Sequence, residues 1–235
     1  MTTVFPDTVK CAMCGAENEF PVIASTNCFG SSDLDLRPAE MQRSTMCYWV
    51  QECPDCGYVS GEVSDPAEIT KEFLESDEYV SCDGRKFKSD LAARFYKEYK
   101  ICTAPASAVK KPSVLDKLFK KKSTDEKLIT AFNAILHAAW ACDDEQDVEN
   151  AKYCRDIAVS LISELISDEH NSNKDTFNVI KCDLLRRAGR FEEVRNEYSS
   201  VKFDNDLLNK IIAFQIDKAE KQDTDCYTIE DTTSE

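Results

Sequence analysis

The sequence predicts an α+β protein that is mostly α-helical. Short runs rich in β-forming residues, "EFPVIAS" and "MCYWVQE", lie within the first 63 residues. Beyond residue 64 the hydrophobic period changes from about two to about 3.6, which is the period of an amphipathic helix. We therefore predict a small β-hairpin domain over residues 1–63 and a helical domain over residues 64–225. Residues 226–235 are expected to form a disordered acidic tail.

Two cysteine pairs share the spacing of a metal-binding knuckle, in "CAMCG" and "CPDCG". Zinc takes four tetrahedral ligands in structural sites, and thiolates bind it well. Two such pairs in one chain supply a complete set. The sequence therefore predicts a zinc ribbon with one structural Zn²⁺ held by Cys11, Cys14, Cys53 and Cys56.

A glycine follows each pair, at Gly15 and Gly57. A knuckle turn needs a residue with positive φ there, so that backbone N–H groups can point at sulfur. The 38 residues between Cys14 and Cys53 exceed the usual ribbon spacing, so we expect an insertion between the knuckles. A redox CxxC motif is the alternative, but it needs a βαβ context that the pattern does not show.

The other cysteines among the twelve in the chain have weaker signals. Four fall in helical patterns and are expected to be small buried hydrophobes: Cys102, Cys142, Cys154 and Cys182. The pattern assigns no role to Cys28, Cys47 or Cys82.

Charge and hydropathy exclude some classes of function. The chain has 44 acidic and 29 basic residues, and binding to nucleic acid requires clustered positive charge. We therefore expect no nucleic-acid partner. No apolar run reaches about 18 residues, so no integral membrane segment is expected. The first residues, "MTTVFPDTVK", lack the features of a secretory signal, which predicts a cytoplasmic protein.

The helical part is expected to start at Ser64 or Asp65, with Pro66 in the first turn. A second helix is expected over residues 87–102. Residues 103–124 hold six lysines and two prolines, which predicts a basic linker or loop. This segment could contact an acidic partner or a membrane surface, or it could simply be solvated.

From residue 123 onward the pattern predicts antiparallel helical hairpins. Gly189 is placed as a C-cap between "CDLLRRA" and "FEEVRNEY". The segments "DVENA" and "AGRFEEV" lie at positions where tetratricopeptide (TPR) repeats turn between paired helices. Their equivalent positions, Ala151 and Val194, are 43 residues apart instead of about 34. The sequence thus predicts a short TPR-like stack and not a regular array.

The motif "DLDLRP" is a candidate ligand or partner site, in which Asp33, Asp35 and Arg37 would make the contacts. If residues 33–37 are extended, these three side chains point to one side and the two leucines to the other. In one interpretation the leucines dock the loop and Arg37 pairs with a carboxylate. In the other, Arg37 grips a carboxylate or phosphate of a ligand in a bidentate manner.

The run from residue 29 to residue 57, "FGSSDLDLRPAEMQRSTMCYWVQECPDCG", resembles the N-terminal region of the DUF2225 family of uncharacterised bacterial proteins. The segments "LHAAWACDDEQDVENAKYCRDIA" and "LLRRAGRFEEV" resemble later parts of that family. The resemblance covers most of residues 8–225 and implies CxxC pairs followed by a TPR-like helical part. It implies no activity. The lysine-rich segment departs from the family as an insertion.

No nucleophile elbow, phosphate-binding loop or HExxH motif is present, and His137 lies in an apolar helical pattern. The sequence therefore favours a non-enzymatic, zinc-binding protein whose TPR-like helices bind a protein or peptide partner. One alternative is an enzyme or small-ligand binder that uses Asp33, Asp35 and Arg37. A second alternative is a thiol redox sensor, since zinc thiolates can be oxidised.

Overall fold

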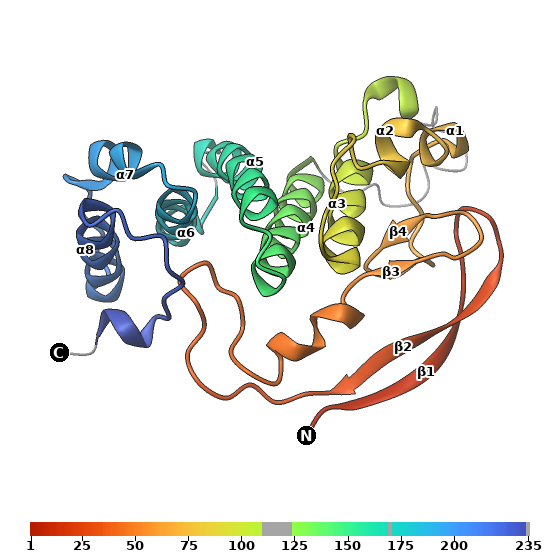
Figure 1. Ribbon diagram of the computed structural model, residues 1–235, viewed down its shortest axis with the longest axis horizontal. Helices are drawn as coiled ribbons and strands as arrows, with labels where there is room; N and C mark the ends of the chain where they lie inside the picture. The colour runs from red at the N-terminus through yellow and green to blue at the C-terminus, as the bar shows by residue number, and fades with distance from the viewer. Residues whose placement is uncertain (110–123, 169–170, 234–235) are drawn as a thin grey trace. The chain divides into compact units, whose positions relative to one another are not determined.

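The computed structural model describes residues 1–109, 124–168 and 171–233. It confirms the predicted class, because two small antiparallel sheets near the N-terminus are followed by helices (Figure 1). The chain folds into two compact units. Unit 1 comprises Met1–Asn27 and Ser44–Asp147, and unit 2 comprises Cys28–Arg43 and Val148–Glu235.

Unit 1 begins with a hairpin of β1 (Thr3–Lys10) and β2 (Glu17–Ser25), and a shorter hairpin joins β3 (Gln51–Glu52) to β4 (Val59–Ser60). The 3-10 helix η1 (Arg43–Tyr48) precedes β3. Two one-turn helices, α1 (Lys71–Leu74) and α2 (Asp77–Val80), lead to α3 (Asp90–Cys102). After the short 3-10 helix η2 (Ala106–Ala108), the long helix α4 (Thr124–Asp144) packs against α3.

Prolines protect both edges of the β1–β2 hairpin, in which Pro6 is paired with Pro21. Neither residue has a backbone N–H, so the pair fits the ladder only as a non-hydrogen-bonded pair. At such a pair the missing donors would have faced outward. Each outer edge therefore lacks a donor near its midpoint, which discourages a further strand from pairing there.

Side-chain caps set where the helices of unit 1 begin. The side chains of Thr70, Ser76 and Ser89 accept hydrogen bonds from backbone N–H groups in the first turns of α1, α2 and α3. The prediction that the first helix starts at Ser64 or Asp65 is wrong. Ile69 is still extended and forms a β-bridge with Val109, so the chain enters a helix only after Thr70.

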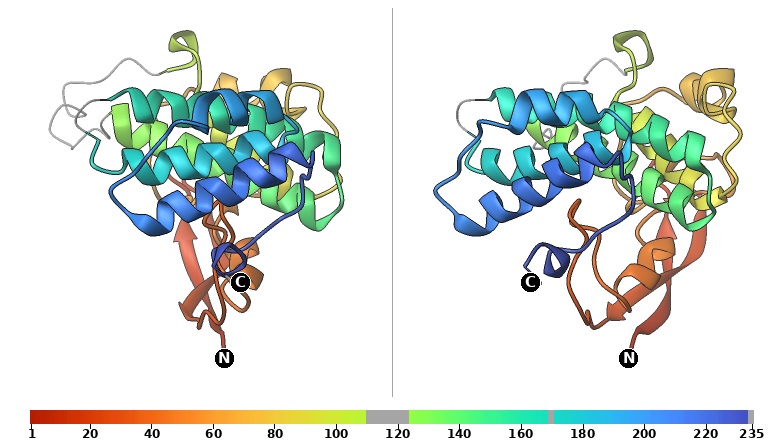
Figure 2. Two further views of the ribbon diagram at one scale, coloured as in Figure 1. Left: turned by 90° about the vertical axis from the view of Figure 1, so that its left-hand side faces the viewer. Right: turned by 60° about the vertical axis from the view of Figure 1, so that its left-hand side comes forward.

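Unit 2 contains α5 (Val148–Ser167), α6 (Lys174–Arg187), α7 (Phe191–Tyr198) and α8 (Asp206–Glu220), with the 3-10 helix η4 (Glu230–Thr232) near its end. Helix α6 packs against α5, α7 and α8, and α7 also packs against α8 (Figure 2). The predicted break between α6 and α7 is confirmed, since Gly189 has a φ of 75° directly after the last turn of α6.

A charged network lies in the core of unit 2. Arg186, on α6, is 0% exposed. Its guanidinium donates to the carboxylate of Asp183 (2.9 Å), to the side chain of Gln215 and to the backbone oxygen of Asp223 (2.8 Å). The ring of Tyr227 lies 5.3 Å from the same guanidinium. These contacts compensate for the loss of hydration, so the buried cation joins α6 to α8 and to the segment after α8.

The segment 28–43, which separates the two knuckles in the sequence, belongs to unit 2. It pairs with the chain after α8, because the N–H of Leu34 donates to the oxygen of Tyr227 and that of Ile229 donates to the oxygen of Ser32, both at 2.9 Å. In Figures 1 and 2 the blue end of the chain meets the orange-red segment at this point. The stretch 226–233, for which the sequence suggested a disordered tail, thus carries ordered backbone contacts.

The two units follow a division different from the predicted boundary at residue 63. A hydrophobic cluster of unit 1 includes residues on both sides of that boundary, such as Tyr58, Val63, Phe73 and Tyr79. Of the predicted loop 103–124, residues 110–123 lie outside the described residues, while Ala108 belongs to this cluster and Ala104 packs against it. Among the described helices, none combines the length and the hydrophobicity that a bilayer crossing requires.

Substitution of Arg186 by Met should destabilise the protein strongly. The change leaves Asp183, which is 1% exposed, as a buried charge without its cation. We expect a loss of about 3–5 kcal/mol in the free energy of unfolding, measured by urea denaturation. Lys221→Met is the matched control, since it removes an exposed ion pair with Asp217 and should cost under about 1 kcal/mol. Equal effects of the two substitutions would contradict the assigned role of Arg186.

Candidate metal centre

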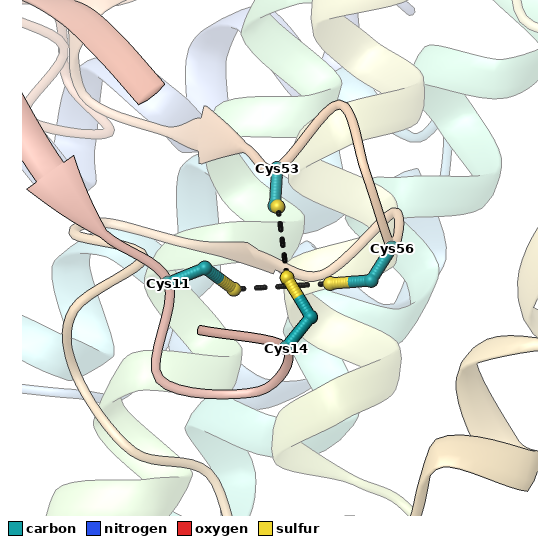
Figure 3. Close-up of side chains that lie close together, drawn as sticks. All are labelled: Cys11, Cys14, Cys53 and Cys56. Carbon is teal, nitrogen blue, oxygen red and sulfur yellow. Dashed lines mark hydrogen bonds between the residues drawn. The ribbon is translucent and has the colours of Figure 1, made fainter. Parts of the chain in front are cut away.

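The two cysteine pairs converge on one point in unit 1. Cys11 and Cys14 lie in the turn after β1, and Cys53 and Cys56 lie in the turn after β3. All four sulfur atoms lie within 4.8 Å of one another and point toward a common centre (Figure 3). The sulfurs of Cys11 and Cys56 are 3.8 Å apart, and those of Cys14 and Cys53 are 3.7 Å apart.

These distances fit a tetrahedral metal site. Four sulfurs at about 2.3 Å from a zinc ion would form a tetrahedron with edges of about 3.8 Å. A disulfide would instead require about 2.05 Å, and all four cysteines are free thiols. The cluster can therefore hold a metal ion. A set of four sulfurs is typical of zinc but also of iron–sulfur centres, so the geometry alone does not identify the metal.

The two knuckles have the same backbone geometry. The N–H of Gly15 donates to the oxygen of Cys11, and that of Gly57 donates to the oxygen of Cys53, both at 2.9 Å. Gly15 and Gly57 have φ values of 81° and 69°, which confirms the predicted need for positive φ. A side chain at either position would strain the turn that brings each pair of sulfurs together.

Backbone N–H groups also face the sulfurs. The N–H of Ala16 donates to Cys14 and lowers the pKa of its thiol. Burial raises the pKa of the Cys53 and Cys56 thiols, although the N–H groups of Asp55 and Tyr58 oppose this. These two thiols therefore resist losing their protons, and a metal ion that binds them would displace those protons.

The centre is built into the core of unit 1. Cys11 and Cys53 are 2% and 0% exposed and belong to the hydrophobic cluster described above. The hydroxyl of Tyr79, on α2, donates to the oxygen of Gly57 at 2.7 Å. The side-chain amide of Asn18, on β2, donates to the carboxylate of Asp55 at 2.8 Å. Contacts from a helix and from the other hairpin therefore hold the second knuckle in place.

The structure places the "DLDLRP" residues in unit 2, and all three are buried. Asp33, Asp35 and Arg37 are 2%, 1% and 6% exposed. The segment is a turn and not an extended strand, since the N–H of Leu36 donates to the oxygen of Asp33 at 2.9 Å. The expected alternation of the leucines is therefore wrong, and Leu36 is 47% exposed with a φ of 66°. A leucine in this strained conformation persists only where the surroundings hold it.

The cations that pair with these carboxylates were not identified from the sequence. Asp33 pairs with Arg43 at 2.6 Å, and Asp35 pairs with Arg187, at the end of α6, at 3.0 Å. The thiol of Cys226 lies 3.2 Å from a carboxylate oxygen of Asp33, and desolvation together with the charges of Asp33 and Asp35 raises the pKa of that thiol, although the residue as a whole is exposed. The "R-R-A-G" ending of α6 was a C-cap signal, but nothing in the sequence linked Arg187 to a residue 152 positions earlier. The Asp33–Arg43 pair closes the segment 28–43 on itself, and the Asp35–Arg187 pair joins the segment to α6.

The cysteines outside the cluster differ in their exposure to solvent. Cys142, Cys154 and Cys182 are buried as predicted, whereas Cys102 is half-buried. Cys82 is buried, and Cys28 and Cys47 are exposed. His137 lies among aromatic rings, with centroid distances of 5.2 Å to Trp49, 5.0 Å to Phe95 and 4.9 Å to Trp140.

Comparison with known proteins finds no match for this chain among family models, curated proteins or solved structures. The resemblance to the DUF2225 family stays a prediction that rests on the residues quoted above.

Loss of one knuckle cysteine should remove the metal. We expect the purified protein to carry one metal ion per chain, and Cys53→Ser to reduce this to a small fraction, because a serine hydroxyl replaces a buried thiolate ligand. Elemental analysis by mass spectrometry measures the ratio. Cys47→Ser is the matched control, as it changes an exposed thiol in the same unit. A Cys53→Ser protein with its full metal content would show that the cluster is not the metal site.

Proposed function

We propose that this protein binds one structural Zn²⁺ through the four knuckle cysteines and acts as an interaction or scaffold module through helices α5–α8. One observation supports the first part: the four sulfurs lie within 4.8 Å of one another, and two pairs among them are 3.8 Å and 3.7 Å apart, as expected for ligands of one zinc ion. A catalytic zinc keeps one position open for water, whereas a site with four protein ligands is closed. The ion therefore serves the fold of unit 1 and not a reaction.

The metal contributes to folding because few other interactions hold the hairpins. Strands β3 and β4 are two residues each, and a two-stranded hairpin has little stability of its own in water. The ion would join the turn after β1 to the turn after β3. Its binding free energy is then part of the folding free energy of unit 1.

The interaction role rests on the helical part. Helices α5–α8 pack as neighbouring elements around α6, and stacked helical hairpins commonly serve as frameworks for binding proteins. The outcome at the predicted ligand site also favours the interaction role over the alternative of a small-ligand binder. Asp33 and Asp35 are buried in ion pairs, so their geometry favours a structural role over a ligand site.

The net charge of −15 defines the chemistry of the proposed partner. Electrostatic complementarity favours a protein or peptide with a basic contact surface, and it mainly increases the rate of association. Added salt should then slow the association, since the Debye length falls to about 3 Å at 1 M salt.

Hydrogen exchange on a purified complex tests this proposal. The metal-loaded protein is used to isolate its partner from the native host, and amide exchange is compared with and without that partner. We expect new protection in α6, α7 and α8 and none in the β1–β2 hairpin. The Cys53→Ser protein should keep its affinity for the partner, because that cysteine belongs to unit 1.

Protection confined to residues 3–25 and 44–60 would contradict the helical interaction role while leaving the zinc site intact. So would complete loss of binding in Cys53→Ser when the exchange of α5–α8 in the free protein is unchanged. In either case the binding surface would lie in unit 1.

A further inference from the structure

Unit 1 contains a cleft of about 580 Å³ beside the second knuckle. Its walls come from four places: the middle of β2, the end of η1 with the residues that lead into β3, the knuckle itself, and one face of α3. The volume falls in the range of small-ligand sites, about 300–1,000 Å³. This cleft plays no part in the proposed helical interaction.

The α3 wall has helical spacing. Asp90, Ala93, Arg94 and Lys97 all line the cleft, at intervals of three and four residues along one face. The small side chain of Ala93 leaves room between the longer ones. Two positive side chains therefore project from the same face of one rigid helix, which positions them better than a loop would.

The two cations differ in their partners. Lys97 donates to the carboxylate of Glu52 at 2.7 Å, and its ammonium lies 5.8 Å from the centroid of the Tyr79 ring. Arg94 is half-buried, and within the described part of the chain its guanidinium has no hydrogen bond or ion pair. Asp90 stands one helical turn away and still forms no ion pair with Arg94.

A second polar group on the opposite wall is also available. Tyr48 ends η1 and is half-buried, and its hydroxyl has no hydrogen-bond partner among the described residues. Phe20, Pro21 and Val50 add apolar surface to the same cleft. A few unsatisfied polar groups that converge on a partly apolar cleft are the usual composition of a small-ligand site.

We propose that this cleft binds a small organic oxyanion, in which a carboxylate or phosphate group is held by Arg94 and by the hydroxyl of Tyr48. The guanidinium offers a planar fork of N–H donors that matches both groups in bidentate geometry. The apolar part of the ligand then lies against Phe20 and Pro21. Lys97 remains paired with Glu52 and adds positive charge nearby.

Two probes with the same ring and different oxyanions test the proposal: benzoate and phenyl phosphate, with benzamide as the uncharged control. Binding to the metal-loaded full-length protein is followed by ¹H–¹⁵N NMR titration. We expect saturable shifts for the amides of residues 47–57 and for the Nε–H of Arg94 with at least one oxyanion, and none with benzamide. The comparison of benzoate with phenyl phosphate tells which group the cleft prefers.

Three variants assign the roles. Arg94→Gln should weaken binding about 10- to 100-fold, as expected for the loss of a charge-assisted contact. Tyr48→Phe should weaken it about 2- to 10-fold. Glu52→Gln should strengthen it several-fold, because Lys97 loses its partner and can turn to the anion. This gain is a result that a purely structural role of the cleft would not produce.

Arg85→Gln is the matched control, since Arg85 lies in unit 1 but does not line the cleft. The affinity of the Arg85→Gln protein for the oxyanion should equal that of the unchanged protein. Metal content and melting temperature are measured for every variant, so that a folding defect is recognised, and Arg94→Lys supplies a second substitution that keeps the charge but not the fork. The proposal is overturned if neither oxyanion binds at 10 mM, or if Arg94→Gln and Arg94→Lys both bind as tightly as the unchanged protein.

Discussion

Four sulfur atoms from two hairpin turns of unit 1 lie within 4.8 Å of one another, and this convergence constrains both turns. The hairpins that carry them are weak structures, and β3–β4 has only two residues in each strand. Their turns are nevertheless alike in hydrogen bonding and in glycine conformation, because each has to direct two sulfurs the same way. Helix α2 contacts this centre, because the hydroxyl of Tyr79 donates a hydrogen bond to the knuckle oxygen of Gly57.

In unit 2, backbone hydrogen bonds and ion pairs hold the irregular segment 28–43. The chain between the knuckles pairs with the segment after α8, and its buried carboxylates Asp33 and Asp35 each form an ion pair, with Arg43 and Arg187 respectively. Burying such pairs adds little net stability, since desolvation offsets most of the attraction. The geometry of the pairs does specify one position for the segment 28–43, because each carboxylate without its arginine would be a buried charge with no partner cation.

The parts of the fold that local chemistry determines could be predicted from the sequence. The knuckles are such a case, because spacing and Gly15 and Gly57 define each turn within a few residues. The break at Gly189 is another. The start of the first helix was misplaced, because the tertiary bridge between Ile69 and Val109 overrides the capping signal of "SDPAE".

Contacts between side chains far apart in the chain could not be predicted from the sequence. The pairing of Asp35 with Arg187 joins residues 152 positions apart, and charged side chains at that separation carry no local signal. The same holds for the cleft, whose walls come from β2, η1, the second knuckle and α3. Only the packing of unit 1 places Tyr48 and Arg94 around one space.

A single metal ion with four sulfur ligands is the central proposal for unit 1, and X-ray absorption at the edge of the metal that co-purifies measures it directly. The geometry predicts four sulfur neighbours at about 2.3 Å with no nitrogen or oxygen ligand, and the proposed structural zinc predicts that the zinc edge carries the signal. A first shell with an oxygen or nitrogen would mean an open or different site. An iron edge in place of the zinc edge would contradict the assignment of the metal, and the absence of bound metal would contradict the account as a whole.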